Sequence, residues 1–340
     1  MLLITHVSHD SRGEHMDESL YRKVKRMILL SELECEPSLD LVQARFLLAS
    51  YKMGHGLESA AFLSIGACAR LAIVLGLDQG TQPDNGAART VLEERSRIWW
   101  GIVIVERCIN LTFPERPLIT PDPEVTDYLP VEDDGLDNGS VQYSTPIPMT
   151  AASSVRAGPF AREAQAASLL GRSLTHIAKP TPDPEFNLEE SRQLERTLTS
   201  FLNVLPREDL IKPCSAYCGA MGMCTSALLL LHTRDGTQRR QAQEEEDSAY
   251  SKDALNSCCG FVVERAAEYT SELATVDLDS LPPFTPYAIY QASVVQHRFL
   301  EQGGTNDGKS IRHGLDLMGK MLASFALRWG VAGKLYRLLR

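Results

Sequence analysis

The sequence has 340 residues, 44% of them hydrophobic and 23% charged, and its formal net charge is −10. This composition indicates a folded globular protein, and a chain of this length can bury one large core or two smaller ones. The acidic balance argues against a chain that grips nucleic acid by itself, because that affinity depends largely on cationic contacts to phosphate. No apolar run reaches the roughly 18–20 residues of a membrane span, and the N-terminal residues are too polar for the core of a signal peptide.

Before residue 80 the hydrophobic spacing predicts helices separated by clear stop signals. Residues 1–15 show no period and are expected to be irregular. Asp17 and Ser38 are placed to cap the first two helices, and Gly76 ends the third. A basic cluster at 22–26 could be a nuclear-import signal, although the solvated face of a helix explains it more simply. The predicted helices are about 17–34, 39–53 and 57–75.

The most informative stretch is residues 90–130, which predicts a buried helix followed by an extended segment. Glu93 and Arg97 are four residues apart in the order that supports a helix. Residues 98–105 contain no charged side chain, and a helix that is apolar on every side must be enclosed by other helices. After Leu111 a series of prolines stops the helix and keeps the following chain extended.

The second half of the chain predicts further helices around a long irregular stretch at 112–158. Residues 179–186 are expected to be a linker, with Asn187 as the cap of the next helix, and the charged stretch 233–247 an exposed connector. The last long helix carries a buried stripe from Leu315 to Trp329. No paired strand signals are present, so the predicted fold is all-α, built of packed helical hairpins. Helices are expected from 159 onward and over about 188–205, 215–232, 249–273, 286–300 and 331–339.

Four short motifs then give the chain a family resemblance. They read RIWW at 97–100, Glu106-Arg107, ERP at 115–117 and DYLP at 127–130. The set resembles the regulatory middle domain of the fungal-specific transcription factors, which accompanies a six-cysteine binuclear zinc cluster. Glu106 stands where that family usually carries aspartate, and Glu115 stands where it carries glycine. The candidate site residues from these motifs are Arg97, Trp99, Trp100, Glu106, Arg107, Arg116, Pro117, Leu129 and Pro130.

The resemblance implies a transcription regulator in the nucleus, controlling a fungal metabolic or secondary-metabolite gene set. It implies one regulatory domain over 16–340, in which 16–130 matches better, 131–158 is a loop and 159–340 is the helical second half. Because no six-cysteine cluster is present, either the chain is an incomplete gene product or DNA is reached indirectly, through a transcription-factor partner or a homodimer. No cofactor, metal or catalytic activity is expected. A small-molecule effector could bind in a pocket beneath the two tryptophans, and a plain scaffold without effector is the alternative.

The cysteines raise the question of a metal site. Cys214, Cys218 and Cys224, together with Cys258 and Cys259, lie at spacings that do not suit a structural zinc site made from short turns. Thiols packed as small apolar groups inside helices fit this pattern better. Without a secretory signal, the eight cysteines are expected to be reduced.

An enzymatic alternative rests on two acidic segments. Asp133, Asp134 and Asp137 form a DDGLD motif like the one with which all-α terpene synthases and prenyl transferases hold magnesium. Residues 306–310, NDGKS, resemble the front half of their second metal motif, and carboxylate and amide oxygens suit magnesium. Against this alternative, Gly314 stands where the second motif needs glutamate, and both segments are expected in loops rather than on facing helices.

Overall fold

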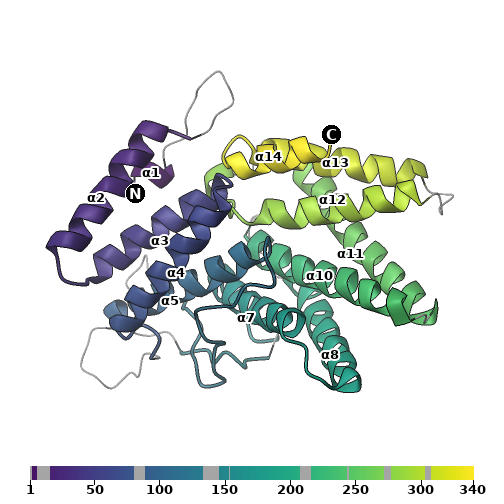
Figure 1. The fold of residues 1–340 in the computed structure, drawn as a ribbon, viewed down its shortest axis with the longest axis horizontal. Coiled ribbons are helices and arrows are strands. Elements are labelled where there is room, and N and C mark those ends of the chain that lie inside the picture. Colours follow the sequence, from purple (N-terminus) through teal and green to yellow (C-terminus); the bar gives the residue numbers. More distant parts are fainter. Residues whose placement is uncertain are drawn as a thin grey trace. The chain divides into compact units, whose positions relative to one another are not determined.

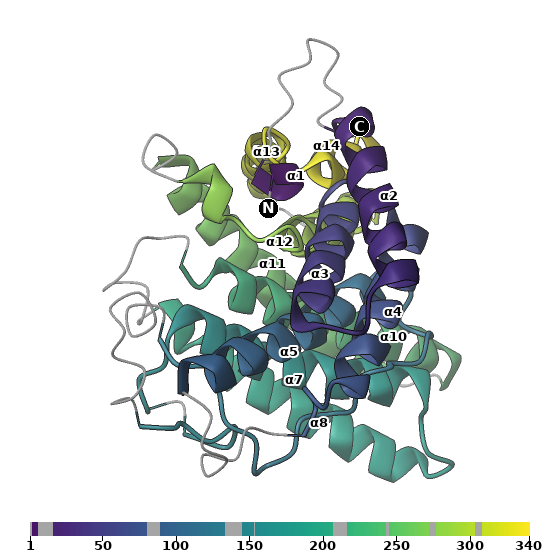
Figure 2. The same ribbon diagram turned by 90° about the vertical axis from the view of Figure 1, so that its left-hand side faces the viewer.

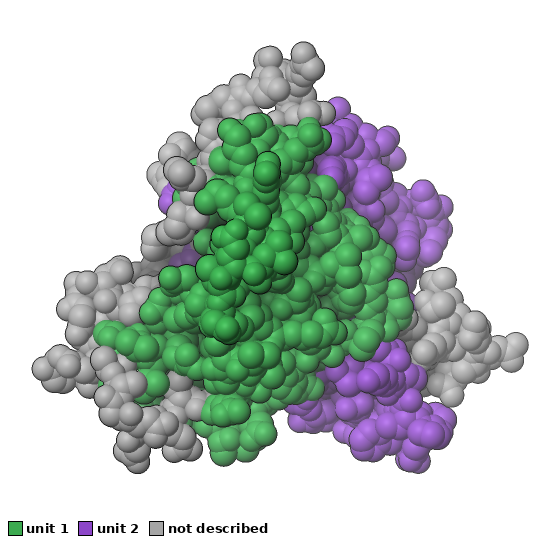
Figure 3. Space-filling view, turned by 60° about the vertical axis from the view of Figure 1, so that its left-hand side comes forward, with its two compact units in different colours: residues 1–171 green, residues 172–340 purple. Residues whose placement is uncertain are grey.

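A computed structural model shows an all-α chain that divides into two compact units, residues 1–171 and 172–340, which Figure 3 colours separately. The prediction of one regulatory domain over 16–340 stays a prediction, and each unit is described by itself. Residue ranges that the structure describes are 2–5, 16–79, 89–132, 145–152, 154–206, 216–242, 245–271, 277–302 and 308–340.

Unit 1 is built from helices that pack as neighbours along the chain. α3 packs against α4, and both pack against α5 (Figures 1 and 2). α1 and α2 cover α3 through an apolar cluster that includes Leu3, Ile28 and Tyr51. The helices of this unit are α1 (Leu2–Thr5), α2 (Glu18–Glu34), α3 (Leu39–Gly54), α4 (Glu58–Val74), α5 (Arg89–Asn110) and the first part of α7 (Pro159–Ala178).

The ends of these helices follow the signals in the sequence. The Asp17 carboxylate accepts a hydrogen bond from the backbone N–H of Leu20 at 2.9 Å, and Ser38 Oγ accepts one from Leu41 at 3.3 Å. Gly76 has a φ of 66°, a left-handed conformation that glycine adopts without steric cost. The two predicted caps and the predicted stop are therefore confirmed. Within 1–15, where no order was expected, the structure describes the single helical turn α1.

α5 is the buried helix that the sequence predicted. From Ile98 to Asn110 every residue except Trp99 is buried. After it comes an extended segment, residues 112–132, which we call the strap. The described part of 112–158 contains no helix, as predicted, and its one regular feature is an isolated antiparallel bridge between Tyr128 and Pro148.

Unit 2 is a second set of packed helices with its own core. α10 packs against α8, α11 and α12, and α13 packs against α11, α12 and α14 (Figure 1). The predicted buried stripe on the last long helix is confirmed at Met318, Leu322 and Phe325. Leu315 is only partly buried, and the helix ends at Phe325, so the buried Trp329 lies beyond it, just before α14. The helices of this unit are α8 (Pro184–Leu202), α10 (Cys218–Ala242), α11 (Glu245–Ser271), the short 3-10 turn η2 (Leu278–Ser280), α12 (Thr285–Glu301), α13 (Gly308–Phe325) and α14 (Gly330–Leu338).

Two boundaries in unit 2 differ from the predictions. α8 begins at Pro184, and its cap is Asp183 rather than Asn187, because proline suits the first helical position and aspartate the position before it. The stretch 233–247 is not a connector: α10 runs on to Ala242, and α11 starts at Glu245. Its glutamines, arginines and glutamates are good helix formers, so a polar sequence here extends the helices instead of ending them.

The described residues contain no strand element, which agrees with the all-α prediction. Among them, no helix is both long and apolar enough to cross a membrane.

Candidate functional site

Glu106 and Arg107 lie side by side on α5 and are almost fully buried, with 1% and 0% of their surfaces exposed. The Glu106 carboxylate accepts hydrogen bonds from the backbone N–H of Ile119 at 2.6 Å and of Thr120 at 3.0 Å. It also accepts one from the Thr120 hydroxyl. Arg107 Nη1 lies 2.8 Å from Glu106 Oε2 and completes an ion pair. This acidic-basic pair therefore holds the first part of the strap against α5.

The Arg107 guanidinium holds the next residues of the strap. Nη2 donates to the carbonyl of Thr120 at 3.2 Å and to that of Pro121 at 2.9 Å, and it lies 3.4 Å from Asp122 Oδ1. Burial lowers the pKa of Arg107, while the carboxylates of Glu106 and Asp122 act in the opposite direction. A buried charge is costly unless it is paired and hydrogen-bonded, and here the strap supplies most of the partners.

Trp100 holds the middle of the strap. Its Nε1 donates to the carbonyl of Tyr128 at 3.1 Å, and its ring belongs to a buried cluster with Leu129 and with alanines at the start of α7. Trp99 is partly buried and packs against the same cluster. Leu129 and Pro130 are both buried. The aromatic and the leucine-proline motifs of the sequence thus meet in one apolar contact.

The far end of the strap is held by the first turns of α5. Glu93 Oε1 accepts from the backbone N–H of Val131 at 3.0 Å, and Arg97 Nη1 donates to the carbonyl of the same residue at 3.1 Å. Arg97 lies 3.6 Å from Glu93 and 4.8 Å from the centre of the Phe160 ring, where its charge faces the π-electrons.

These contacts show that the strap runs antiparallel to α5. Glu93 meets Val131, Trp100 meets the residue at 128, and Glu106 meets 119–120, so numbers rise on one segment as they fall on the other. Thirteen residues of helix span about 20 Å, whereas twelve extended residues can span about 40 Å. The strap therefore has slack, and a turn in which Asp127 N donates to the Glu124 carbonyl at 3.1 Å takes up part of it.

The remaining motif lies in the turn at the start of the strap. The Arg116 guanidinium lies 3.7 Å from the centre of the Phe113 ring and 4.7 Å from that of Phe62 on α4. Glu115 and Pro117 on either side of it are exposed. Arg116 therefore stacks between two rings and joins the turn to α4, while its two neighbours contact solvent.

α7 holds the chain that returns from the strap, through residues that sequence analysis missed. Arg162 Nη2 donates to the carbonyl of Val155 at 2.8 Å, and its Nη1 donates to Gln165 Oε1 at 2.8 Å. Gln165 Nε2 in turn donates to the carbonyl of Met149 at 3.3 Å. The sequence signal that could have indicated this role is Arg162 itself, an arginine next to the alanines that form the buried side of the helix.

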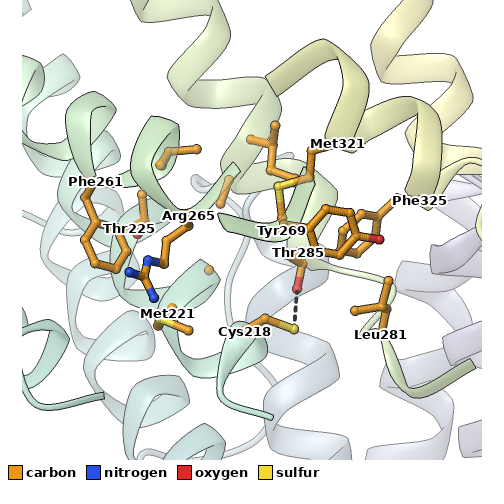
Figure 4. Close-up of a pocket in the computed structure, with 14 residues that line it drawn as sticks. Cys218, Met221, Thr225, Phe261, Arg265, Tyr269, Leu281, Thr285, Met321 and Phe325 are labelled. Carbon is orange, nitrogen blue, oxygen red and sulfur yellow. Dashed lines mark hydrogen bonds between the residues drawn. The ribbon is translucent and has the colours of Figure 1, made fainter. Parts of the chain in front are cut away.

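The structure does not support an effector pocket beneath the two tryptophans, because Trp100 is 3% exposed and is enclosed by its apolar cluster. A cavity that opens to solvent and holds about 60 Å³ of accessible space lies instead within unit 2, between α10, α11, α12 and α13 (Figure 4). Sequence analysis missed this cavity because no local pattern announces that four helices leave a gap between them.

The cysteines of unit 2 are packed thiols. Cys224, Cys258 and Cys259 are buried, and burial raises the pKa of Cys258 and of Cys259 to about 12. The predicted packed role is confirmed for these three, and Cys218 lines the cavity. Cys214 lies outside the described residues. In the part of the chain that the structure describes, no three histidine, cysteine or acidic side chains gather as metal ligands would.

The acidic motifs of the enzymatic alternative lie largely outside the described residues. This applies to Asp133, Asp134 and Asp137 and to Asn306. Ser310, expected in a loop, is instead in the first turn of α13, a helix that begins at Gly308.

Comparison with known proteins agrees with the motifs on α5 and the strap. The chain is 27% identical over 181 residues to the transcription factor tazR of Aspergillus terreus, which covers 49% of this chain and 28% of that protein. It is 36% identical over 76 residues to the transcription factor BOA15 of Botryotinia fuckeliana, which covers 22% of this chain and 42% of that protein. The alignments thus span less than half of either relative, and no solved structure matched the chain.

The sequence model of one family matches a continuous stretch that contains α2 to α5, the strap, α7 and α8. It is described as the fungal specific transcription factor domain, and the match covers residues 4–203, more than half of the chain. The protein therefore belongs to the fungal specific transcription factor domain family.

Proposed function

We propose that the protein is a transcription regulator that acts in the nucleus on a fungal metabolic or secondary-metabolite gene set. The observation that carries the proposal is the family match over residues 4–203, within which the motif residues Trp100 and Glu106 of α5 hydrogen-bond to the strap. Two curated relatives named as transcription factors support it.

Protein–protein contact is the mechanism that we propose, with DNA reached indirectly through a transcription-factor partner or a second copy of the chain. The formal net charge of −10 supports this, because a DNA-gripping surface needs an excess of cations. The eight cysteines are spread along the 340 residues, and no six of them fall within one short segment.

A regulatory rather than catalytic role fits the chemistry of the motif residues. Glu106 and Arg107 direct their polar atoms at each other and at the strap, so neither presents a reactive group to a substrate. The second candidate is a magnesium-dependent enzyme acting on isoprenyl diphosphates through Asp133, Asp134 and Asp137. It rests on the motif in the sequence alone.

A deletion experiment tests the proposal in a fungus that carries the gene. Transcript profiling of the deletion strain is expected to show a coherent set of changed genes, which the wild-type chain restores. We expect Asp133→Asn/Asp134→Asn, at normal protein abundance, to restore the same set, because the proposed function does not use these carboxylates. An unchanged transcript profile in the deletion strain contradicts the regulator, and failure of the double variant alone favours the enzyme.

A further inference from the structure

The cavity in unit 2 has apolar walls and a mouth that carries a charge. Buried side chains from four helices form its interior, among them Met221, Tyr269 and Phe325. The partly exposed lining residues mark its opening to solvent, and they include Cys218, Phe261 and Arg265. The space inside it that solvent-sized spheres can enter is about 60 Å³, several times what one water molecule needs. Its apolar walls with a few polar groups are typical of small-molecule sites.

Arg265 on α11 is the cation of this cavity. Figure 4 shows its guanidinium lying between Phe261 and Met221, and it is 5.8 Å from the centre of the Phe261 ring. Nη2 pairs with Glu268, whose side chain is 46% exposed. The Arg265 Nε atom is buried and has no hydrogen-bond partner among the described residues. Nε itself is enclosed, but the Arg265 side chain as a whole is 24% exposed, so its charge can be approached by a group at the mouth.

The other polar groups of the cavity are uncharged, and they include the hydroxyls of Thr285 and Tyr269. The Thr285 hydroxyl donates to Cys218 Sγ at 3.9 Å, a long bond to a poor acceptor, drawn dashed in Figure 4. The Tyr269 hydroxyl lies 3.1 Å from Ser324 Oγ and is satisfied there. Thr285 can turn its hydroxyl toward a ligand with little loss, so a second polar atom on the ligand would find a partner.

We propose that this cavity binds a small organic acid with an apolar body, whose carboxylate pairs with Arg265 at the mouth. The body, aromatic or branched, replaces water between the aromatic and methionine walls. The carboxylate pairs with the exposed part of the guanidinium, whose planar N–H groups suit a carboxylate. As an effector this ligand would deepen the proposed function, but its binding is a property of the purified chain and is tested without reference to transcription.

The carboxylate of Glu268 competes with the ligand for Arg265, and this determines whether each substitution should raise or lower the affinity for a carboxylate ligand. It occupies one arm of the guanidinium, so its removal frees that arm and lowers the local negative charge. Glu268→Gln is expected to tighten a carboxylate ligand several-fold and to leave an uncharged analogue unchanged. Arg265→Met keeps much of the apolar stem and removes the charge, so it is expected to weaken the carboxylate about tenfold, the size of one charge-assisted hydrogen bond.

The probes are 2-naphthoate and 2-naphthamide, which share shape and differ in charge, titrated into the purified full chain by calorimetry. Wild type is expected to prefer the carboxylate about tenfold. Arg312→Met is the matched control, because it removes the same charge from an exposed position on α13 outside the cavity. Gly222→Leu fills the cavity from α10 and is expected to abolish binding of both probes.

Several outcomes would overturn the proposal. These are equal affinity of wild type for the two probes, no binding of either, or naphthoate binding that Arg265→Met leaves unchanged. Because Arg265 and Glu268 are partly exposed, their variants keep the test decisive even if Gly222→Leu does not fold. A negative result here leaves the gene-deletion experiment unaffected, so failure of the ligand and failure of the regulator can be told apart.

Discussion

The ion pair of Glu106 and Arg107 shows how a buried charge can act as a connector at the scale of single residues. The two side chains pair with each other, and both bind backbone groups of the strap that would otherwise lack partners. Removing one member leaves the other buried and unpaired, which is far worse than replacing both. This asymmetry makes the pair a sensitive point of unit 1.

Arg107→Met is expected to lower the free energy of unfolding of unit 1 by about 3–5 kcal/mol, because Glu106 stays buried without its counter-charge. The urea dependence of hydrogen exchange in α5 peptides measures this loss. Arg22→Met is the control, since Arg22 and Glu18 form an i,i+4 pair whose side chains are 73% and 62% exposed. Such an exposed pair contributes about 0.3–0.5 kcal/mol, so equal losses in the two variants would contradict the connector role.

Gly171 on α7 faces the same pair. A Cβ atom there would lie 3.0 Å from Arg107 Nε and 3.1 Å from Asp122 Oδ1, closer than ordinary contacts. Gly171→Ala is therefore expected to destabilise unit 1, although alanine favours a helix by about 1 kcal/mol. Gly260→Ala on α11 supplies the contrast, because nothing lies within 4 Å of its added methyl group. That variant is expected to be more stable than wild type, by thermal denaturation. If Gly171→Ala also stabilised the protein, Arg107 would have to move away from the added methyl group, and this prediction would be wrong.

At the scale of elements, the α3–α4 hairpin encloses a lysine. Lys52 on α3 is buried, and its ammonium group donates to Ser64 Oγ on α4. Desolvation, with smaller effects from Lys25 and Arg45, lowers the pKa of Lys52 to about 8, against an ordinary value of 10.5. Burying the charged form of Lys52 therefore destabilises the folded hairpin, and the size of this effect depends on pH.

The sign of this dependence follows from proton binding. Between pH 8 and 10.5 the unfolded chain keeps the proton on Lys52 and the folded chain does not, so this residue makes stability rise with pH. Below pH 8 both states are protonated, and the folded state bears the full cost. We expect the stability of Lys52→Met relative to wild type, from urea unfolding, to be greatest below pH 8 and to fall toward pH 10.5. A difference that stays constant with pH contradicts this account.

At the scale of the whole molecule, the chain contains two units that each bury their own apolar cluster. Such units can unfold separately, because a unit with its own core can in principle fold alone. We expect hydrogen exchange in urea to give different midpoints for α3–α5 peptides and for α11–α13 peptides. Arg107→Met should shift only the first. Coincident midpoints that move together would show that the units unfold as one.

The sequence by itself determined the helical class and most helix positions, because hydrophobic period, caps and stops act within a few residues. Asp17, Ser38 and Gly76 did what their local chemistry predicted. The family motifs were visible in the sequence, and its uninterrupted apolar run predicted the burial of α5. Local rules failed where they competed, as at Asp183, and where a polar stretch was also a good helix former, as at 233–242.

Only the tertiary structure decided what the motif residues do. Whether Glu106 meets Thr120, or Glu93 meets Val131, depends on the direction in which the strap returns along α5, and residues 14 and 38 positions apart carry no local record of it. The same applies to the cavity, whose walls come from four helices. Pairing across such distances is set by how helix faces fit together, and a one-dimensional pattern of apolar residues shows which face is buried but not what lies against it.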